Sequence, residues 1–285
     1  MTSFKRTLRG GANTAFTGFC WIATIVALTA LTAILWSLLL KGVPGLNMDV
    51  LTMSTPSTGS RGGLLNAIVG SVIMCAVAML IAMVIAMVVG VLAGTWLAEF
   101  GRRSAFAEAV RFLNDILLSA PSVLVGLFVW IILVNPFHGF SALAGSVSLA
   151  IIAVPIVVRT TEDVLALQPT ALREAGLALG TPYWTTIRTI LWKSARSGIL
   201  TGGLLAFARI SGETAPLLFT SLNNQFFSLN ITKPMASLPV VIFNFALTPY
   251  DDLQRLAWTA SLLIAGAVLA INIAARFATR EPRRS

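Results

Sequence analysis

The sequence predicts an all-α integral membrane protein with about six transmembrane helices in a single domain, residues 1–285. The chain is 56% hydrophobic and only 11% charged, whereas a soluble domain carries about 25% charged residues. The mean hydropathy is +0.86, and apolar runs long enough to cross a bilayer recur along the chain. One globule cannot hide so much apolar surface from water, so we expect lipid to cover it.

The first two predicted spans cover residues 16–40 and 65–97. Three basic residues precede the first span, and its apolar run is longer than the short apolar region of a signal peptide. We therefore expect a helix that stays in the membrane as an anchor. The second span is long and carries no charged residue over most of its length.

Prolines occur within the other spans, among them Pro121 in the third and Pro155 in the fourth. Proline is tolerated in membrane helices because neighbouring helices and Ser or Thr side chains satisfy the freed backbone carbonyls. The remaining spans are predicted at residues 116–134, 142–158, 199–220 and 256–275.

The distribution of basic residues predicts the orientation of these spans. Fifteen of the 20 Lys and Arg residues fall in segments on the same side as the N-terminus, and four fall on the opposite side. Cytoplasmic loops carry the excess of Lys and Arg. Both termini are therefore expected in the cytoplasm, and the net charge of +9 is explained by membrane orientation rather than by nucleic-acid binding.

A polar segment, residues 159–196, is predicted as a cytoplasmic loop that contains a short helix from about residue 170. Thr170 is a suitable N-cap for this helix. Gly180 is placed to end it as a C′ glycine. The spacing of three apolar residues predicts an apolar stripe along one side of the helix, and the stripe consists of Leu172, Ala175 and Leu179.

A second short helix is predicted directly after this glycine. Thr181 and Pro182 match the N-cap and the first helical position. Its apolar stripe consists of Trp184, Ile187 and Leu191. Two amphipathic helices joined by a glycine turn form either a docking surface for a partner protein or an interfacial pair that lies on lipid headgroups, and the residues alone do not separate the two.

The fifth predicted span carries two charged residues, Arg209 and Glu213. A charge in hydrocarbon costs several kcal/mol, so an ionisable residue there is a functional hypothesis by default. A spacing of four residues puts both side chains on one face of a helix, close enough to pair. The pair belongs either to a substrate path or gate, or to a structural contact between helices.

Nothing in the sequence indicates an enzyme, a resident cofactor or a metal site. The chain has one histidine and two cysteines, and it lacks the phosphate-binding Gly-Lys loop of ATPases and the usual hydrolase motifs. Four carboxylates in polar segments are expected to be solvated or to lie among lipid headgroups, namely Glu99, Glu108, Glu162 and Asp163.

The loop and the fifth span together resemble a known family. Glu174-Ala175-Gly176, Gly180 and Ile190 resemble the EAA loop of ABC importer permeases. Residues 206–218 and 118–128 resemble the phosphate permeases of that family, the PstA family. The resemblance covers roughly residues 60–275 and implies the type I ABC importer permease fold.

The resemblance implies a subunit that moves inorganic phosphate into the cell across the bacterial cytoplasmic (inner) membrane. A second permease similar to PstC, an ATPase dimer similar to PstB and a secreted binding protein similar to PstS would be its partners. ATP and Mg²⁺ would bind to the ATPase and not to this chain. The loop residues Glu174, Ala175, Gly176, Gly180 and Ile190 would couple to the ATPase.

Two alternatives stay open at this point. One is a permease for another oxyanion, such as sulfate or phosphonate. The other is a stand-alone ion-coupled carrier that uses Arg209 and Glu213.

Overall fold

The computed structural model describes residues 3–101 and 104–278, which form helices and no β-strand. The first part of the chain contains α1 (Ser3–Gly42), η1 (Val43–Gly45), α2 (Met48–Thr52), α3 (Leu65–Ala82), η2 (Met83–Gly90), α4 (Val91–Glu99), α5 (Ala105–Ser119), α6 (Ser122–Val129) and η3 (Trp130–Val134). The second part contains α7 (Ala142–Ala166), α8 (Thr170–Ala178), α9 (Tyr183–Thr186), η4 (Ile187–Leu191), α10 (Trp192–Ser211), α11 (Ala215–Thr220), α12 (Leu238–Ala246) and α13 (Asp251–Ala278).

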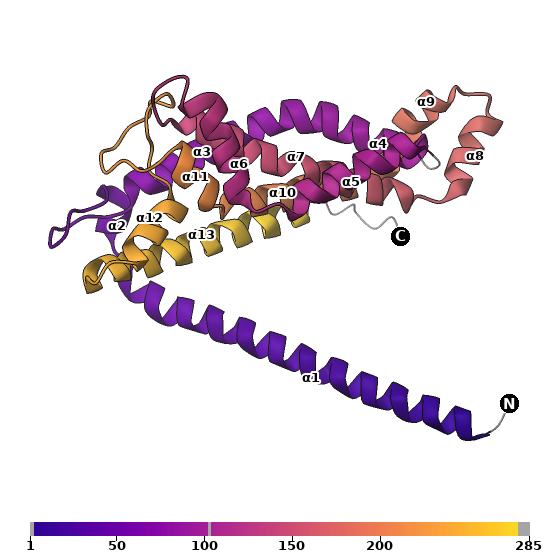
Figure 1. The fold of residues 1–285 in the computed structure, drawn as a ribbon, viewed down its shortest axis with the longest axis horizontal. Coiled ribbons are helices and arrows are strands. Elements are labelled where there is room, and N and C mark those ends of the chain that lie inside the picture. Colours follow the sequence, from indigo (N-terminus) through magenta and orange to yellow (C-terminus); the bar gives the residue numbers. More distant parts are fainter. Residues whose placement is uncertain (1–2, 102–103, 279–285) are drawn as a thin grey trace.

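The predicted first span is confirmed as part of α1, which stands apart from the rest of the fold (Figure 1). The helix contacts the body near Gly42, whose carbonyl accepts a hydrogen bond of 3.1 Å from Thr259 on α13. From this contact α1 diverges from α13, and the described side chains of residues 13–36 are exposed. A bilayer is the environment in which such an apolar helix is stable.

The predicted second span is confirmed as α3, η2 and α4, which follow one another without a gap from Leu65 to Glu99. Its middle, η2, is wound as a π-helix, a wider turn that is uncommon in membrane and soluble helices alike.

The third predicted span is wrong at its start. The helix α5 ends at Ser119, and α6 begins at Ser122 after a bend of 96°. Pro121 lacks a backbone N–H and forces the residue before it out of the helical region, and Ala120 is accordingly extended, with ψ of 138°. Residues 116–119 therefore belong to α5 and not to the span, which starts at Ser122.

The fourth predicted span is confirmed but is longer than expected. The helix α7 continues past residue 158 to Ala166, because no proline or glycine occurs between residue 158 and Pro169. The pair of Arg159 and Asp163, four residues apart and 3.3 Å from nitrogen to oxygen, supports this extension. The connecting segment that was predicted from residue 159 therefore begins at about residue 167.

The fifth predicted span is interrupted, because α10 ends at Ser211 and α11 begins at Ala215. If the helix continued, the ring of Pro216 would clash with the carbonyl of Gly212, four residues earlier. At its other end, α10 follows directly on α9 and η4. The second short helix predicted after Gly180 is therefore wrong as a separate unit, since it is the start of this longer helix.

The predicted sixth span is confirmed within α13. By length and composition, four of the described helices can cross a membrane, and the bent pair of α5 with α6 and η3 can supply a fifth crossing. The predicted all-α membrane class is confirmed. The predicted count of about six exceeds these four or five crossings, because α10 and α11 do not form one uninterrupted span.

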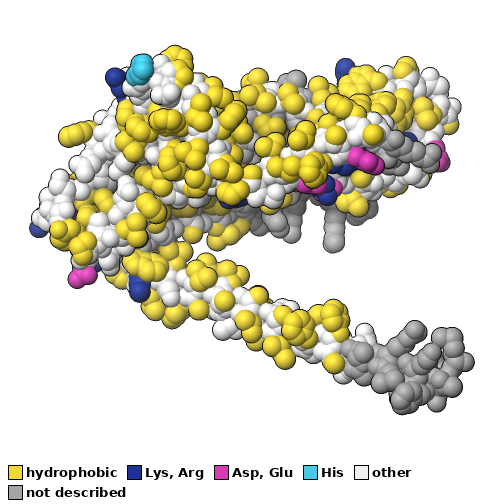
Figure 2. Space-filling view, viewed as in Figure 1, with side chains coloured by type: hydrophobic (Ala, Val, Ile, Leu, Met, Phe, Trp, Pro, Cys, Tyr) yellow, Lys and Arg dark blue, Asp and Glu magenta, His cyan; other side chains and the backbone are white. Residues whose placement is uncertain are grey.

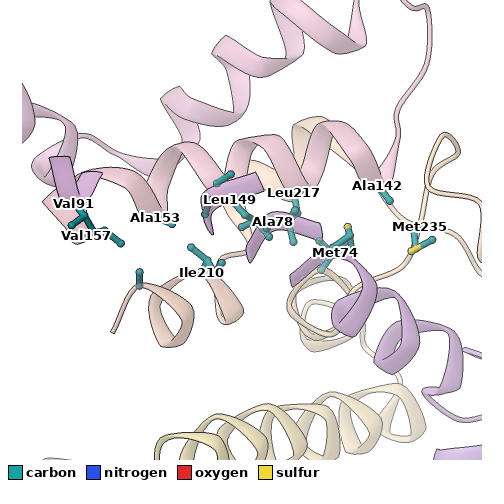
Figure 3. Packing of buried hydrophobic residues seen from close by; sticks show 14 residues of the cluster. Met74, Ala78, Val91, Ala142, Leu149, Ala153, Val157, Ile210, Leu217 and Met235 are labelled. Carbon is teal, nitrogen blue, oxygen red and sulfur yellow. The ribbon is translucent and has the colours of Figure 1, made fainter. Parts of the chain in front are cut away.

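The core of the body surrounds α7. Figure 3 shows the buried side chains of α7 facing those of α3, α10 and α11, with Ile210 and Leu217 on opposite sides of the interruption. Glycine lets helices approach closely here: a methyl group added to Gly126 on α6 would lie 2.7 Å from Cα of Pro216 on α11. This contact fixes the position of α11 against α6.

The two ends of the body differ in what they contain. Figure 1 shows α8 and α9 at one end of the body and the long loops at the other. The first residues of α1 and the last residues of α13 lie toward the end that holds α8 and α9. Figure 2 shows that apolar side chains cover most of the visible face. Residues 102–103 and 279–285, which hold five of the basic residues that predict orientation, lie outside the described residues, and the assignment of the cytoplasmic side stays a prediction.

Candidate functional site

The glycine turn after α8 has the predicted form. Gly180 has a φ of +73°, a backbone conformation that glycine adopts without steric cost. Its N–H donates to the carbonyl of Leu177 at 2.9 Å, and the N–H of Thr181 donates to the carbonyl of Gly176 at 3.4 Å. These two bonds form a Schellman motif, so the prediction that Gly180 ends the helix is confirmed.

The predicted N-caps of the two short helices are wrong by one residue. Thr170 is the first residue of α8, and Thr181 lies one residue before Pro182, the cap of α9. The hydroxyl of Thr181 instead donates to the carbonyl of Gly176 at 2.7 Å and lies 2.8 Å from the hydroxyl of Thr186. This threonine pair closes the turn between α8 and α9.

Gly176 on α8 lies in close contact with Thr186 on α9. A methyl group added to Gly176 would lie 2.4 Å from Cγ2 of Thr186, which is fully buried. A side chain at this position would therefore push the two helices apart.

The outer face of α8 is apolar, and most of the predicted apolar stripe lies on it. Leu179 is 79% exposed, Ala175 is exposed, and only Leu172 is partly buried. The residues that face inward are Arg173 and Gly176. The helix α8 therefore presents leucine side chains together with the exposed carboxylate of Glu174 to its surroundings.

An ion pair that sequence reasoning missed holds α8 to the end of α4. Nε of Arg173 donates to Oε2 of Glu99 at 2.8 Å, and Nη2 donates to Oε1 at 2.5 Å. The hydroxyl of Tyr183 on α9 also donates to Oε2 of Glu99, at 2.6 Å. The side chain of Glu99 is 1% exposed, so the expectation that this carboxylate is solvated is wrong.

A second carboxylate predicted to be solvated is partly buried and paired. Glu162 on α7 accepts a hydrogen bond of 2.6 Å from Nε of Arg111 on α5, and its side chain is 12% exposed. The same arginine donates to the carbonyl of Leu97 on α4 at 2.9 Å. Glu108 and the side chain of Asp163 are exposed, as expected.

Arg209 and Glu213 pair as predicted, across the interruption between α10 and α11. Arg209 lies in the last turn of α10, and Glu213 lies beyond the helix end, so the two do not share one continuous helix. The side chain of Glu213 is 6% exposed and that of Arg209 is 57% exposed. A buried carboxylate thus holds a guanidinium whose outer surface can still bind an anion, because the guanidinium carries five N–H donors.

The two groups of predicted site residues lie in different parts of the fold. Glu174, Ala175, Gly176 and Gly180 lie on α8 and its turn, at the end of the body, whereas Ile190 lies half-buried on η4. Arg209 lies at the other end of the helix that starts with α9. The structure therefore connects the two groups through one helix rather than bringing them together (Figure 1).

Comparisons with known proteins agree with this geometry. Residues 90–280 match the family model of the binding-protein-dependent transport system inner membrane component. The chain is 51% identical over 264 residues to the phosphate transport system permease protein PstA of Haemophilus influenzae, covering 93% of this chain and 92% of that protein. It is 54% identical over 244 residues to the PstA protein of Yersinia pestis, covering 85% and 81% of the two chains.

A solved structure shares the fold. The MetNI methionine ABC transporter in an inward-facing conformation matches with a TM-score of 0.63 and 19% identity, over 76% of this chain and 94% of that one. At this level of identity the match supports the arrangement of helices and says nothing of the transported molecule.

Proposed function

This chain belongs to the binding-protein-dependent transport system inner membrane components, within which its relatives are PstA permeases, and we propose that it is the permease subunit of an ATP-driven importer of inorganic phosphate. The observation that carries the proposal is the ion pair of Arg209 and Glu213 at an interruption of a membrane helix. Irregular backbone at membrane depth is tolerated only where protein covers it or where it lines a water-filled cavity.

The chemistry of Arg209 suits phosphate. A guanidinium presents its N–H groups as a planar fork that matches two phosphate oxygens, and such bidentate contacts are stronger than neutral hydrogen bonds. Glu213 alone would repel the anion. A pair that is closed without substrate and opens when phosphate takes the place of the carboxylate would act as a gate.

The exposed face of α8 is the proposed contact for a partner ATPase. Glu174 and Ala175 are exposed there, while Gly176 and Gly180 shape the helix pair behind them. An ATPase dimer similar to PstB would bind ATP and Mg²⁺, because this chain has no phosphate-binding Gly-Lys loop of its own.

The proposed complex contains two further partners. A second permease similar to PstC would face the exposed side of Arg209 and supply further basic groups, since one arginine neutralises only part of a phosphate dianion. A binding protein similar to PstS would deliver phosphate to the end of the body opposite α8. Both termini would lie in the cytoplasm of a bacterial cell, with the chain in the inner membrane.

Reconstitution of the complete complex in liposomes tests the proposal. Phosphate uptake and ATP hydrolysis are measured for the wild type and for Arg209→Lys, which keeps the charge but loses the fork. Uptake by the variant should fall by about tenfold or more, because a point charge cannot hold two oxygens. Arg159→Lys is the matched control, since Arg159 also pairs with carboxylates, Asp115 and Asp163, but lies on the exposed part of α7.

Each alternative gives a different result in the same assay. If the complex takes up sulfate or phosphonate faster than phosphate, the transported substrate is that other oxyanion. Transport by the chain alone, without an ATPase, would assign an ion-coupled carrier. Normal uptake by Arg209→Lys would show that Arg209 does not belong to the substrate path. If the variant complex fails to assemble, the pair of Arg209 with Glu213 is a structural contact.

A further inference from the structure

We infer that Arg173, Glu99 and Tyr183 are positioning residues that fix α8 to the end of α4, so that the two helices move as one body during transport. The inference rests on the proposed docking of an ATPase at α8, because only then does the position of α8 matter for coupling. It concerns residues outside the EAA-like set, since Glu99 lies on a different helix and Arg173 precedes Glu174.

The guanidinium of Arg173 joins three parts of the chain. It contacts both carboxylate oxygens of Glu99 at 2.5 and 2.8 Å. It also donates to the carbonyl of Leu165 at the end of α7, at 2.9 Å, and to the carbonyl of Gln168, at 2.8 Å. One side chain on α8 therefore holds the end of α4, the end of α7 and the connection that leads into α8.

Tyr183 adds the first turn of α9 to the same network. Its hydroxyl donates to Oε2 of Glu99 at 2.6 Å. Its ring lies edge-on to that of Phe100, with the ring centres 5.4 Å apart. The carboxylate of Glu99 is thus the common acceptor for α8 and α9, and both oxygens are used.

Burial of the ion pair between Glu99 and Arg173 favours one position of α8 relative to α4. The side chains of Glu99 and Arg173 are 1% and 10% exposed, so water cannot replace a lost partner. If α8 moved away from α4, two opposite charges would be left unpaired in a poorly solvated site. An exposed pair, such as Arg159 with Asp163, imposes no such restriction because water screens it.

The other contacts of α8 are apolar or lead to other helices. Its outer residues are exposed, and its close contact on the inner side is that of Gly176 with Thr186 on α9. That contact joins α8 to α9 and not to α4. Leu172 packs against an apolar cluster that includes Ala98 of α4, and Glu99 adds the charged, hydrogen-bonded link between α8 and α4.

The first test measures position directly, in the complex with its ATPase in nanodiscs. Spin labels are attached at Ala171 on α8 and Leu92 on α4, both exposed, after Cys20 and Cys75 are replaced by alanine. We expect one narrow distance distribution in the wild type, with and without trapped nucleotide. Glu99→Gln and Arg173→Lys should broaden it, whereas Tyr183→Phe should broaden it less because it removes one hydrogen bond.

The second measurement is the amount of phosphate moved per ATP hydrolysed. We expect this ratio to fall by about tenfold in Glu99→Gln and Arg173→Lys, within the range of measured coupling effects, while the ATPase still co-purifies with the permease. Glu162→Gln is the matched control, since Glu162 forms a partly buried pair with Arg111 at the same end of the body without touching α8. The control should leave the distance distribution and the ratio unchanged.

Several results would overturn the inference. It is wrong if the distribution stays narrow in both Glu99→Gln and Arg173→Lys, or if Glu162→Gln broadens it to the same extent. If either variant fails to assemble, the milder Tyr183→Phe decides by the same two measurements. A wild-type complex that binds no ATPase would instead refute the proposed function, and the label distances would still decide whether α8 and α4 form one body.

Discussion

Replacing Gly180 by valine should open the turn between α8 and α9 without any steric clash. The φ of Gly180 is +73°, and no atom lies within 4 Å of a methyl group added to it. The cost of the substitution therefore comes from the backbone alone. For an L-residue in the left-handed region this cost is about 1–2 kcal/mol, and a β-branched side chain lies at the upper end of this range.

This cost can be converted into a measurable opening of the turn. Hydrogen exchange reports the free energy of local opening, and 1–2 kcal/mol corresponds to a change of about 5- to 30-fold in an equilibrium constant. The amides to follow are those of residue 180, bonded at 2.9 Å, and Thr181, bonded at 3.4 Å. Their exchange should accelerate by that factor in Gly180→Val.

The matched variant is Gly180→Asn, because asparagine is tolerated in the left-handed region at helix ends. Its exchange should stay within about twofold of the wild type. ATP hydrolysis coupled to transport should fall in the valine variant and persist in the asparagine variant. Equal exchange in the valine variant and the wild type would refute the reasoning, as would an asparagine variant that opens as readily as valine.

Three further outcomes are expected. Gly126→Leu should separate α6 from α11, since even a methyl group would lie 2.7 Å from Cα of Pro216, and the melting temperature of the purified complex should fall by several degrees. Burial, and next the hydrogen bond to Glu99, raise the pKa of the Tyr183 hydroxyl. The hydrogen bond from Tyr183 to Glu99 should therefore persist below the ordinary tyrosine pKa of about 10 and be lost only as the pH rises through the raised pKa. Tyr183→Phe should remove the part of the phenolate absorbance that develops at the highest pH. Cysteines at Ser3 and Thr58 should react with an impermeant thiol reagent from opposite sides of the membrane, and labelling of both from outside would contradict the predicted orientation.

The long spans could be predicted from the sequence because their signal is local. An apolar run of sufficient length indicates a membrane helix wherever it packs. Residues 16–40, 65–97 and 256–275 accordingly lie within α1, α3 to α4, and α13.

The bend and the interruption could be predicted only in part. Pro121 and Pro216 indicate that a helix cannot continue unchanged. Neither residue specifies the 96° angle between α5 and α6, because that angle depends on how α6 packs against α11 through Gly126. Information of this kind lies in contacts between distant segments and not in any short window.

The orientation of α8 illustrates the same limit. The spacing of Leu172, Ala175 and Leu179 predicts an apolar stripe but gives no sign that the buried residues of α8 are Arg173 and Gly176. The partner of Arg173, Glu99, lies 74 residues earlier in the chain, so the pair leaves no periodic signal. In contrast, the pairing of Arg209 with Glu213 was predictable because the two residues are only four positions apart.

The helix formed by α9, η4 and α10 runs without a gap from Tyr183, beside the Gly180 turn, to Ser211, just past Arg209. At 1.5 Å per residue its length is roughly 40 Å. If such a helix behaves as a stiff rod, a tilt of about 5° at one end displaces the other by about 3–4 Å, more than the length of a hydrogen bond. A slight rotation near α8 would thereby move the end of α10 that carries Arg209 relative to α6 and α7. Such a helix would carry movement from the Gly180 turn to Arg209. Flexibility introduced at η4, which is wound as a π-helix, would reduce that movement without altering a residue at either end.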